Sequence, residues 1–452
     1  MLREAIETYH EILSAGSLAA ETDGEMRGHL RRMGLYFGDR PICTVLRPHF
    51  YFTDQWAYLK HETEILLGAF ARAHEACLHS AELRQQLALQ AYEEQLFSLD
   101  IGGIVPWTTS RLDSFFRPEE GKLQFVEYNA ETPAGMGYGD VLVEMFEMLQ
   151  PMRRFEKRFH VHAMPMLKDL LGVLLQAYAE WGGQGKPQIA IMDWREVPTL
   201  NEHELSRRAF ESEDVSAFLV DPRAVEYRSG ALWAGDRKID LIYKRVLINE
   251  LIDRMGIDNP IVRAYRDRAV LLTNSFSCKL MAKKASFAFV SDERNAGLFT
   301  AEQRSAIEQH IPWTRLVSDR RTEFQGREVD LLEFLSENRE RFVLKPNDEY
   351  GGKGVMLGWE SSQEAWDEAL MHALSSPFVA QHRVEPITRL FPAWIDGHLD
   401  ISPRYVDADP YVFYGRTVYG CLTRLSSVSL LNVTAGGGSV VPMFLLERRD
   451  SQ

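Results

Sequence analysis

Cysteine is scarce in this sequence, and its few copies lie far apart. The 452 residues contain Cys43, Cys77, Cys278 and Cys421, and none of them forms a Cys-x-x-Cys pair. Zinc sites and small disulfide frameworks need closely and regularly spaced cysteines. We therefore expect free thiols in a reducing, cytoplasmic compartment, with neither a zinc site nor a disulfide framework.

A long apolar run and an excess of positive charge are also missing. No stretch approaches the roughly 18 apolar residues of a membrane-spanning helix. The charged residues Arg3, Glu4, Glu7 and Glu11 argue against a signal peptide at the N-terminus. Lys and Arg number 51 against 65 Asp and Glu, giving a net charge of −14, which argues against a general nucleic-acid binder. The composition, 45% hydrophobic and 26% charged, is typical of a soluble globular protein with roughly two to four cores.

The most informative stretch is FVLKPNDEYGGKGVMLG, residues 342–358. It predicts a short strand ending near Lys345, a turn with Gly351, Gly352 and Lys353, and a second strand. Glycines let backbone N–H groups approach an anion closely, and lysines supply charge for phosphate oxygens. The stretch is not a P-loop, because Gly354 stands where that motif has Ser or Thr. Phosphate binding and an ordinary hairpin with a solvated lysine remain alternatives for this stretch alone.

A second polar motif lies on a predicted strand, KLQFVEYN. Alternation along a strand places Glu127 and Asn129 on one face and Val126 on the other. Carboxylate and amide oxygens are suitable ligands for Mg²⁺. Asp113, on the preceding strand or turn, can add a third oxygen, and Arg111 would share its face. We favour a metal and phosphate site over the alternative of a solvent-facing polar edge.

The rest of the chain divides by its periodicity. Residues 1–100 are predicted to be mostly helical, with the aromatic stretch RPICTVLRPHFYF forming a turn between helices. The alternation of PQIAIMDW, NEHELSRRAFES, VSAFLV and IDLIYKRV predicts an α/β layer. Further helices are predicted at 140–149, 163–181, 329–340 and 361–374, and through most of 248–290. Strands are predicted at 377–386 and over a longer region, 389–418.

In this order the motifs resemble a circularly permuted ATP-grasp ligase of the glutathionylspermidine synthetase type. The acidic elements RLD and FVEYNAETP come before KKA, FVLKP and FVAQHRVEP, whereas an ordinary ATP-grasp chain has its lysines first. NVTAGGGSVVP loosely matches the closing element of the family. The resemblance implies an α+β or α/β fold with a helical region at 1–100, the first part of the ATP-grasp domain at 101–185, a pre-ATP-grasp-like α/β domain at 186–275 and a nucleotide-binding region at 276–452.

The resemblance also assigns roles to individual residues. Asp113, Glu127 and Asn129 would bind the Mg²⁺ ions that bridge the phosphates of ATP, Arg111 would face the transferring phosphoryl group, and Thr132 would face the acceptor carboxylate. Lys284 and Lys345 would be the nucleotide lysines, and Gly351, Gly352 and Lys353 would form the phosphate flap. The strand with Gln381, His382 and Val384 would present the adenine hinge, mainly through backbone groups.

These assignments predict an ATP- and Mg²⁺-dependent ligase that joins a small-molecule or peptide carboxylate to an amine through an acylphosphate. Such chemistry needs positioning and charge rather than a covalent protein nucleophile, and the sequence has no convincing nucleophile–base arrangement. One alternative is a phosphotransferase that stops after the first step. Another is a non-catalytic nucleotide-binding or scaffold protein. The identities of the acid and the amine and the oligomeric state are not predicted.

Overall fold

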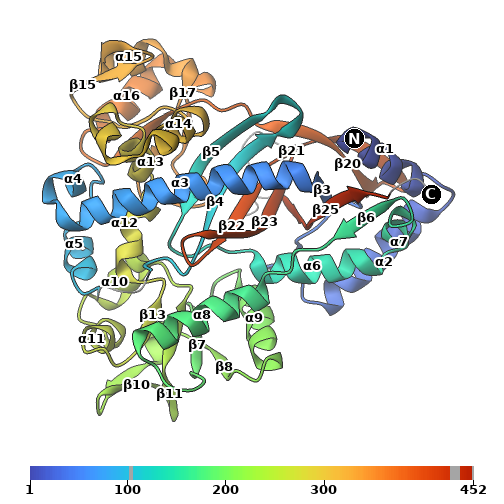
Figure 1. Cartoon of the computed structure of the whole chain (residues 1–452), viewed down its shortest axis with the longest axis horizontal. Coiled ribbons are helices and arrows are strands. Elements are labelled where there is room, and N and C mark those ends of the chain that lie inside the picture. Colours follow the sequence, from blue (N-terminus) through green and yellow to red (C-terminus); the bar gives the residue numbers. More distant parts are fainter. Residues whose placement is uncertain (101–104, 428–437, 450–452) are drawn as a thin grey trace.

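The structure is a computed structural model that describes residues 1–100, 105–427 and 438–449. Most of the closing motif NVTAGGGSVVP, residues 432–437, is therefore outside the described residues. Figure 1 shows a long helix, α3, crossing the molecule beside a large antiparallel sheet, with a smaller parallel sheet below and a third sheet at the upper left. In the described part of the chain no helix has the length and apolar character needed to cross a membrane.

The N-terminal region is mainly helical, as predicted. Its helices are α1 (Leu2–Leu13), α2 (Leu18–Arg32), α3 (Thr53–His79), α4 (Ala81–Gln85) and α5 (Ala91–Phe97). The predicted turn between them is wrong in part, because it contains β3 (His49–Phe52), which pairs in parallel with β25 (Met443–Arg448). The four side chains of β3 are buried, and its partner strand lies at the opposite end of the sequence, where no local pattern reveals it.

The large sheet joins segments from both halves of the chain. Its order is β20-β21-β23-β22-β4-β5, with β24 paired to β23. The strands are β4 (Thr109–Arg117), β5 (Lys122–Asn129), β20 (Ile387–Ile395), β21 (His398–Val406), β22 (Asp409–Phe413), β23 (Thr417–Ser426) and β24 (Ser439–Val441). The predicted strand region 389–418 is thus a series of hairpins. The pairing of β22 with β4 brings the acidic motifs beside the C-terminal strands.

The predicted α/β layer forms a four-stranded parallel sheet. Its order is β13-β12-β7-β8, with β7 (Ile189–Met192), β8 (Ala217–Val220), β12 (Leu241–Lys244) and β13 (Leu271–Thr273). The helices around it are α8 (Leu167–Trp181), α9 (Leu200–Ser212), α10 (Ile248–Met255) and α11 (Pro260–Arg266). The prediction of helix through β13 is wrong, since a buried strand of three residues has no periodicity that separates it from a helix. A sheet of this type binds ligands at the carboxyl ends of its strands, where the strand order reverses.

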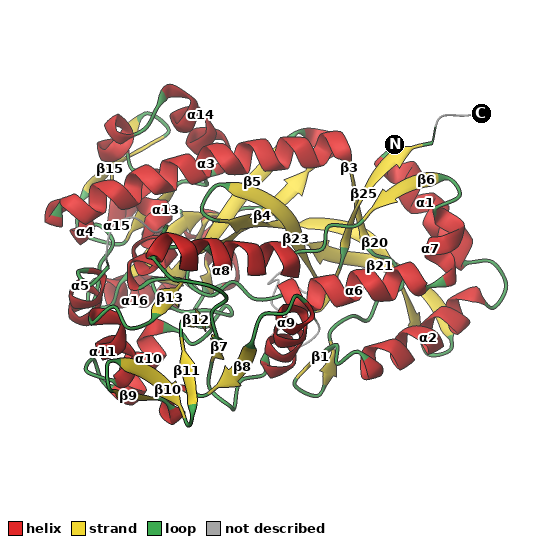
Figure 2. Cartoon of the chain, turned by 60° about the horizontal axis from the view of Figure 1, so that its bottom comes forward, coloured by secondary structure: helices red, strands yellow, loops and turns green. Residues whose placement is uncertain are grey.

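Figure 2 shows that α6 lies between the parallel sheet and the first two helices, α1 and α2. Helix α6 (Met136–Met148) begins four residues before the predicted start and is followed by α7 (Gln150–Phe155). Strand β6 (Phe159–His162) then pairs with β25, so the helix predicted at 163–181 starts only at Leu167. The small sheet of β9 (Glu226–Arg228), β10 (Ala231–Ala234) and β11 (Arg237–Ile239) extends from the parallel sheet, below it in Figure 1.

The third sheet carries the glycine-rich stretch. Its order is β14-β19-β17-β18, with β14 (Thr314–Leu316), β17 (Phe342–Pro346), β18 (Met356–Leu357) and β19 (Phe378–His382). The predicted strand–turn–strand is confirmed, since Val343 pairs with Leu357. The strand predicted at 377–386 ends at His382. The helices of this region are α12 (Lys279–Ala282), α13 (Ala285–Val290), α14 (Ala301–His310), α15 (Leu331–Glu337) and α16 (Gln363–Ala373). The helix predicted from residue 329 starts at Leu331, because the hairpin of β15 (Arg321–Phe324) and β16 (Arg327–Asp330) comes first.

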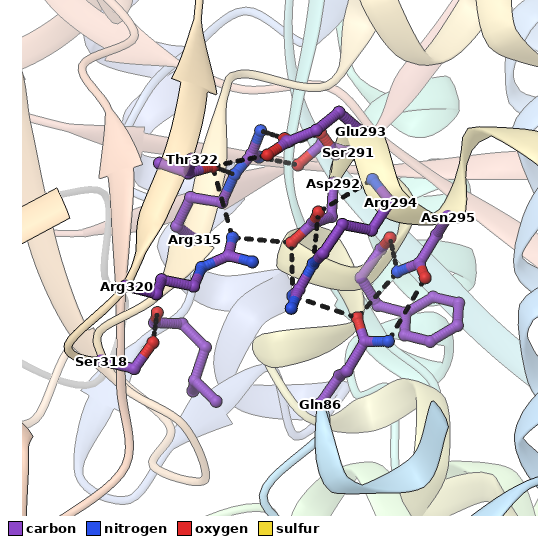
Figure 3. A network of polar contacts seen from close by, with 12 residues as sticks. Gln86, Ser291, Asp292, Glu293, Arg294, Asn295, Arg315, Ser318, Arg320 and Thr322 are labelled. Atoms are coloured by element: carbon purple, nitrogen blue, oxygen red, sulfur yellow. Dashed lines mark hydrogen bonds and ion pairs between the residues drawn. The ribbon is translucent and has the colours of Figure 1, made fainter. Parts of the chain in front are cut away.

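A polar network ties this third sheet to the N-terminal helices (Figure 3). Gln86, at the end of α4, exchanges two side-chain hydrogen bonds of 3.3 and 2.9 Å with Asn295. Nearby, Asp292 accepts hydrogen bonds from Arg294 and, at 2.7 Å, from Arg320, which lies just beyond β14. The N-terminal helices are therefore connected to the region that carries the glycine-rich turn.

Candidate active site

A cavity of about 420 Å³ is bounded by residues of all these layers. It is lined by the end of β5 and the loop after it, by the carboxyl edge of the parallel sheet, by α12 and by the glycine-rich turn. The predicted residues that line it are Arg111, Asp113, Glu127, Asn129, Thr132, Lys284 and Gly351. The two acidic motifs and the first nucleotide lysine therefore meet at one cavity.

The pairing of β4 with β5 creates the acidic face. Arg111 is opposite Asn129 and Asp113 is opposite Glu127, with a register shift directly after Asp113. Arg111 Nε donates to Asp113 Oδ1 at 2.8 Å, and Asn129 Nδ2 donates to the same oxygen at 2.8 Å. The structure thus brings together the four residues that the sequence placed on a common face.

An arginine and two aspartates complete this face, and sequence reasoning missed them. Arg424 of β23 contacts Asp113 Oδ2 at 2.7 Å, Asp407 Oδ2 at 2.7 Å and Asp409 Oδ2 at 2.9 Å. Burial alone would raise the pKa of Asp113, but Arg111 and Arg424 outweigh it and lower the pKa to about 2. The alternation Asp-Ala-Asp beside apolar residues was the available signal for a buried polar strand face.

The two predicted nucleotide lysines lie next to each other at this face. Lys284 Nζ is 2.8 Å from Glu127 Oε1 and donates to the carbonyl of Glu349 at 2.5 Å. Lys345 Nζ donates to Gln381 Oε1 at 2.7 Å and to the carbonyl of Val126 at 3.2 Å. Burial lowers the pKa of Lys345 to about 8, although Glu127 opposes the shift.

The neighbouring lysines form a second, deeper group. Lys283 has other partners than Lys284 and pairs with Glu93 Oε2 at 2.8 Å and with Asp348 Oδ2 at 3.2 Å. Lys279, which the sequence did not single out, contacts Glu131 Oε2 at 2.9 Å and Asp348 Oδ1 at 2.6 Å. Asp348 belongs to the glycine-rich turn, so these ion pairs hold the start of the turn against α12.

The glycine-rich turn has the backbone that the sequence indicated. Gly351, Gly352 and Gly354 have φ angles of +66°, +76° and +72°, a conformation that side chains with a Cβ rarely adopt. Gly351 lines the cavity, whereas Gly352 and Lys353 do not. The side chain of Lys353 is 76% exposed and pairs with Glu349 at 3.2 Å. In this conformation Lys353 belongs to the outer surface of the turn.

The predicted hinge strand lies outside the lining of the cavity. Gln381 is buried and holds Lys345, while its amide nitrogen donates to Thr314 Oγ1 at 3.1 Å. The backbone N–H of His382 donates to the carbonyl of Trp313 at 2.8 Å. Val384 follows the end of β19. Gln381 therefore supports Lys345, His382 supports the third sheet, and none of the three residues is part of the cavity lining.

Two residues at the edge of the parallel sheet were also missed. Asp193 and Arg245 directly follow β7 and β12, at the point where the strand order reverses, and both line the cavity. Arg245 Nη1 donates to the carbonyl of Pro133 at 2.8 Å, and Nη2 donates to that of Thr132 at 3.3 Å. Arg245 thus positions the loop that carries Thr132. A polar residue directly after each buried strand was the signal in PQIAIMDW and IDLIYKRV.

The donor set fits a hard cation that is shared with phosphate. Arginines lower the pKa of Asp113, and Lys284 lowers that of Glu127 against the effect of burial, so both carboxylates are ionised. No group of three His, Cys, Asp or Glu side chains suited to a metal ion occurs within the described ranges. Two carboxylates and the amide of Asn129 are a typical partial set for Mg²⁺, which completes its shell with water and substrate phosphates.

The fold and this site define an ATP-grasp protein whose acidic strands precede its lysine strands. The family model of circularly permuted ATP-grasp type 2 matches residues 88–426, and the chain belongs to that family. The predicted fold class and the permuted order are therefore confirmed. The solved structure of a glutathione synthetase-like effector from Globodera pallida, in its apo form, has a TM-score of 0.61 and 11% identity over 96% of this chain and 99% of that one, which supports the fold alone.

Similar curated proteins carry a ligase name. Two Frankia proteins, provisionally named glutamate–cysteine ligase 2-2 in Frankia casuarinae and 2-3 in Frankia alni, are 25% and 24% identical over 93% of this chain. The chain spans about half the length of these relatives, 48% and 49%. An uncharacterised protein of Mycobacterium tuberculosis is 25% identical over 75% of this chain and 61% of its own length.

Proposed function

We propose that the protein is an ATP- and Mg²⁺-dependent ligase that joins a carboxylate to an amine and releases ADP and phosphate. One observation carries the proposal: the β4–β5 pair and Lys284, which come from opposite halves of the chain, meet at one cavity as paired charged groups. Lys345 lies outside the cavity lining but donates to the carbonyl of Val126, next to Glu127. Family membership and the ligase names of the Frankia relatives support it. Those names make glutamate and cysteine the first acid and amine to test.

Each residue of the acidic face has a distinct role in this proposal. Asp113, Glu127 and Asn129 would hold Mg²⁺, which supplies charge neutralisation for the phosphates when bound. Lys284 and Lys345 would contact phosphate or adenine. Lys284 would exchange its ion pair with Glu127 for the nucleotide, and Lys345 would exchange its hydrogen bond to Gln381. Arg111 would face the transferring phosphoryl group with Nη1, which donates to the carbonyl of Ala134 at 2.8 Å in this structure.

The reaction has two steps. A substrate carboxylate oxygen attacks the γ-phosphorus of ATP, and ADP leaves with the electrons of the broken P–O bond. The amine nitrogen then attacks the acyl carbon, an amide bond forms, inorganic phosphate leaves and the nitrogen loses a proton. The protein contributes orientation and charge rather than a covalent bond. The turn at 347–355 would exclude water from the acylphosphate, which would otherwise hydrolyse.

The test is ADP release across a panel of acids and amines, starting with L-glutamate and L-cysteine. The proposal expects ADP release that needs both an acid and an amine, with one amide formed per ADP. A phosphorylated product without an amine requirement would identify a phosphotransferase. Failure to bind a non-hydrolysable ATP analogue in the presence of Mg²⁺ would overturn the proposal, and binding without turnover for any pair would favour a nucleotide-binding scaffold.

A further inference from the structure

On the part of the cavity wall formed by α9 and the start of α6, one carboxylate oxygen lacks a hydrogen-bond partner. Glu202, near the start of α9, is 5% exposed and lines the cavity. Its Oε1 accepts a hydrogen bond of 2.6 Å from the backbone N–H of Gly135, at the start of α6. Its Oε2 is buried and, among the described residues, has no donor with hydrogen-bond geometry, although the backbone N–H of Gly137 is near enough to lower the pKa of Glu202. A buried carboxylate oxygen without a donor is costly, so this oxygen has a free acceptor position that a ligand can use.

Two further acceptors line the same cavity. Asn249 Oδ1 is buried and, among the described residues, has no donor. Asp193 Oδ2 lies 3.6 Å from His203 Nε2, too far for a hydrogen bond. Asp193 and His203 also line a second cavity, so Asp193 borders both cavities. Burial lowers the pKa of His203 to about 3, so its imidazole is neutral and does not offset the charge of Asp193.

The arginine closest in charge effect to these carboxyl groups, Arg245, already donates hydrogen bonds to other protein groups. Arg245 donates to the carbonyls of Pro133 and Thr132 and, at 3.3 Å, to the hydroxyl of Tyr243. Arg245 therefore acts on Glu202 and Asp193 electrostatically, by lowering their pKa, and donates no hydrogen bond to their free oxygens. Burial raises the pKa of Glu202 and raises that of Asp193 to about 6, and the charge of Arg245 opposes both shifts. This part of the cavity wall therefore combines partly compensated carboxyl groups with free acceptor oxygens.

The missing partner has the properties of an organic cation. In the described part of the chain no three acidic, histidine or cysteine side chains converge as a metal site. An ammonium group carries one positive charge and three N–H donors, so it can satisfy the free oxygen of Glu202 and still donate to another acceptor of the cavity wall. Donor groups of this kind are the common recognition partners of buried carboxylates.

We propose that Glu202, with Asp193 and Asn249, binds the ammonium group of an amino acid whose carboxylate reaches Arg111 and Thr132. The inference rests on the proposed ligase function and names its acid substrate class. The bound nitrogen is a recognition group rather than the reacting amine, because a protonated nitrogen has no lone pair to attack the acylphosphate. Glu202, Arg111 and Thr132 all line one cavity, so a single substrate can contact them together.

The conservative variant Glu202→Gln separates ligand binding by Glu202 from its structural hydrogen bond with Gly135. Its side-chain oxygen still accepts from Gly135, while its amide nitrogen replaces the acceptor Oε2 and removes the charge. Asp193→Asn provides a second, independent loss of charge. Glu204→Gln is the matched control, because Glu204 is on the same helix but pairs with Arg207 and does not line the cavity.

The measurement is isothermal titration of the full chain, saturated with a non-hydrolysable ATP analogue and Mg²⁺, with the proteinogenic amino acids and their N-acetyl derivatives. We expect at least one free amino acid to bind, and its N-acetyl form to bind at least about 10-fold more weakly. Glu202→Gln should weaken the affinity for the free amino acid by about 10- to 100-fold, and Glu204→Gln should leave this affinity unchanged.

The outcomes distinguish this inference from the function on which it rests. If the nucleotide analogue binds but no amino acid binds, or free and acetylated forms bind alike, the ammonium site is wrong and the ATP-dependent function stands. If Glu202→Gln and Asp193→Asn both bind the amino acid like the parent, the site is also wrong. If the nucleotide analogue itself does not bind, the proposed function fails and the inference fails with it.

Discussion

Two groups of residues that line the cavity differ in how their charges are satisfied. We call the group around Asp113, Glu127 and Lys284 the lysine end, and the group of Glu202, Asp193 and Asn249 the acceptor end. At the lysine end, Asp113 has two arginine partners, and Glu127 has Lys284 at 2.8 Å. At the acceptor end, Glu202 Oε2 and Asn249 Oδ1 lack donors among the described residues. The first end is an internally paired set of charges, and the second is a set of free acceptors.

The difference indicates two modes of binding. At the lysine end a ligand must exchange for existing ion pairs, so the phosphates of ATP can replace Glu127 at Lys284 only if a cation takes over the carboxylate. Nucleotide and Mg²⁺ binding should therefore be mutually dependent there. At the acceptor end a ligand adds its donors to unsatisfied oxygens, and no internal pair has to break. The predictions that follow test this contrast.

The largest effect is expected for Glu127→Gln, which removes a metal-ligating charge but keeps the shape of the side chain. ADP release should fall by about 100-fold or more, because a shared metal ion contributes several kcal/mol of charge stabilisation. The circular dichroism spectrum and thermal midpoint provide the folding control. Turnover equal to that of the parent at saturating ATP and Mg²⁺ would show that Glu127 is not a metal ligand.

Lys284→Ala should weaken binding of a non-hydrolysable ATP analogue by roughly 30- to 150-fold, equivalent to about 2–3 kcal/mol for a charged contact. The matched variant is Lys283→Ala. Lys283 pairs with the buried Glu93, so its loss should lower the thermal midpoint much more than the affinity. Titration calorimetry measures the loss of affinity and thermal unfolding measures the loss of stability, so the two effects can be told apart in each variant. The opposite pattern, with affinity lost only in Lys283→Ala, would exchange their roles.

Lys345 should make nucleotide affinity depend on pH. Its pKa of about 8 means that the amine is charged below that pH and neutral above it. Affinity should therefore be nearly constant below about pH 7 and weaken by about 10- to 30-fold as the pH rises to about 9.5. The variant Lys345→Arg stays charged throughout and should lose this dependence if it still binds. An identical pH profile for both proteins would contradict the assignment.

The smallest effect is expected for Lys353→Ala. Its side chain is mostly exposed and pairs with Glu349 on the outside of the turn, and such surface pairs contribute about 1 kcal/mol at most. Affinity for the ATP analogue should change by no more than about fivefold. A loss as large as that of Lys284→Ala would show that the turn closes far enough to bring Lys353 onto the nucleotide.

The lysine end was largely predictable from the sequence because its signals are local. Strand alternation placed Glu127 and Asn129 on one face, and the glycine cluster indicated the turn between β17 and β18. Even there, alternation did not distinguish Lys284 from Lys283; the family resemblance selected Lys284. The side chains separate because the chain turns between α12 and α13, where Lys283 has an extended backbone and Lys284 a helical one.

The acceptor end was not predicted because its residues are brought together only by tertiary structure. Glu202 is on α9, Asp193 follows β7 and Asn249 is on α10, and each by itself is an ordinary polar residue. The strand β3 was missed for the same reason, since its partner β25 is distant in sequence. Likewise, the order of the parallel strands decides that Asp193 and Arg245 reach the cavity.

The most direct test of the two-ended cavity is a crossed titration of Lys284→Ala and Glu202→Gln with the ATP analogue and with the amino acid that the parent binds. Nucleotide affinity should weaken by roughly 30- to 150-fold in Lys284→Ala and stay within about threefold in Glu202→Gln. Affinity for the amino acid, measured with the nucleotide site saturated, should show the reverse. Equal losses of both ligands in both variants, or no loss in either, would contradict the account.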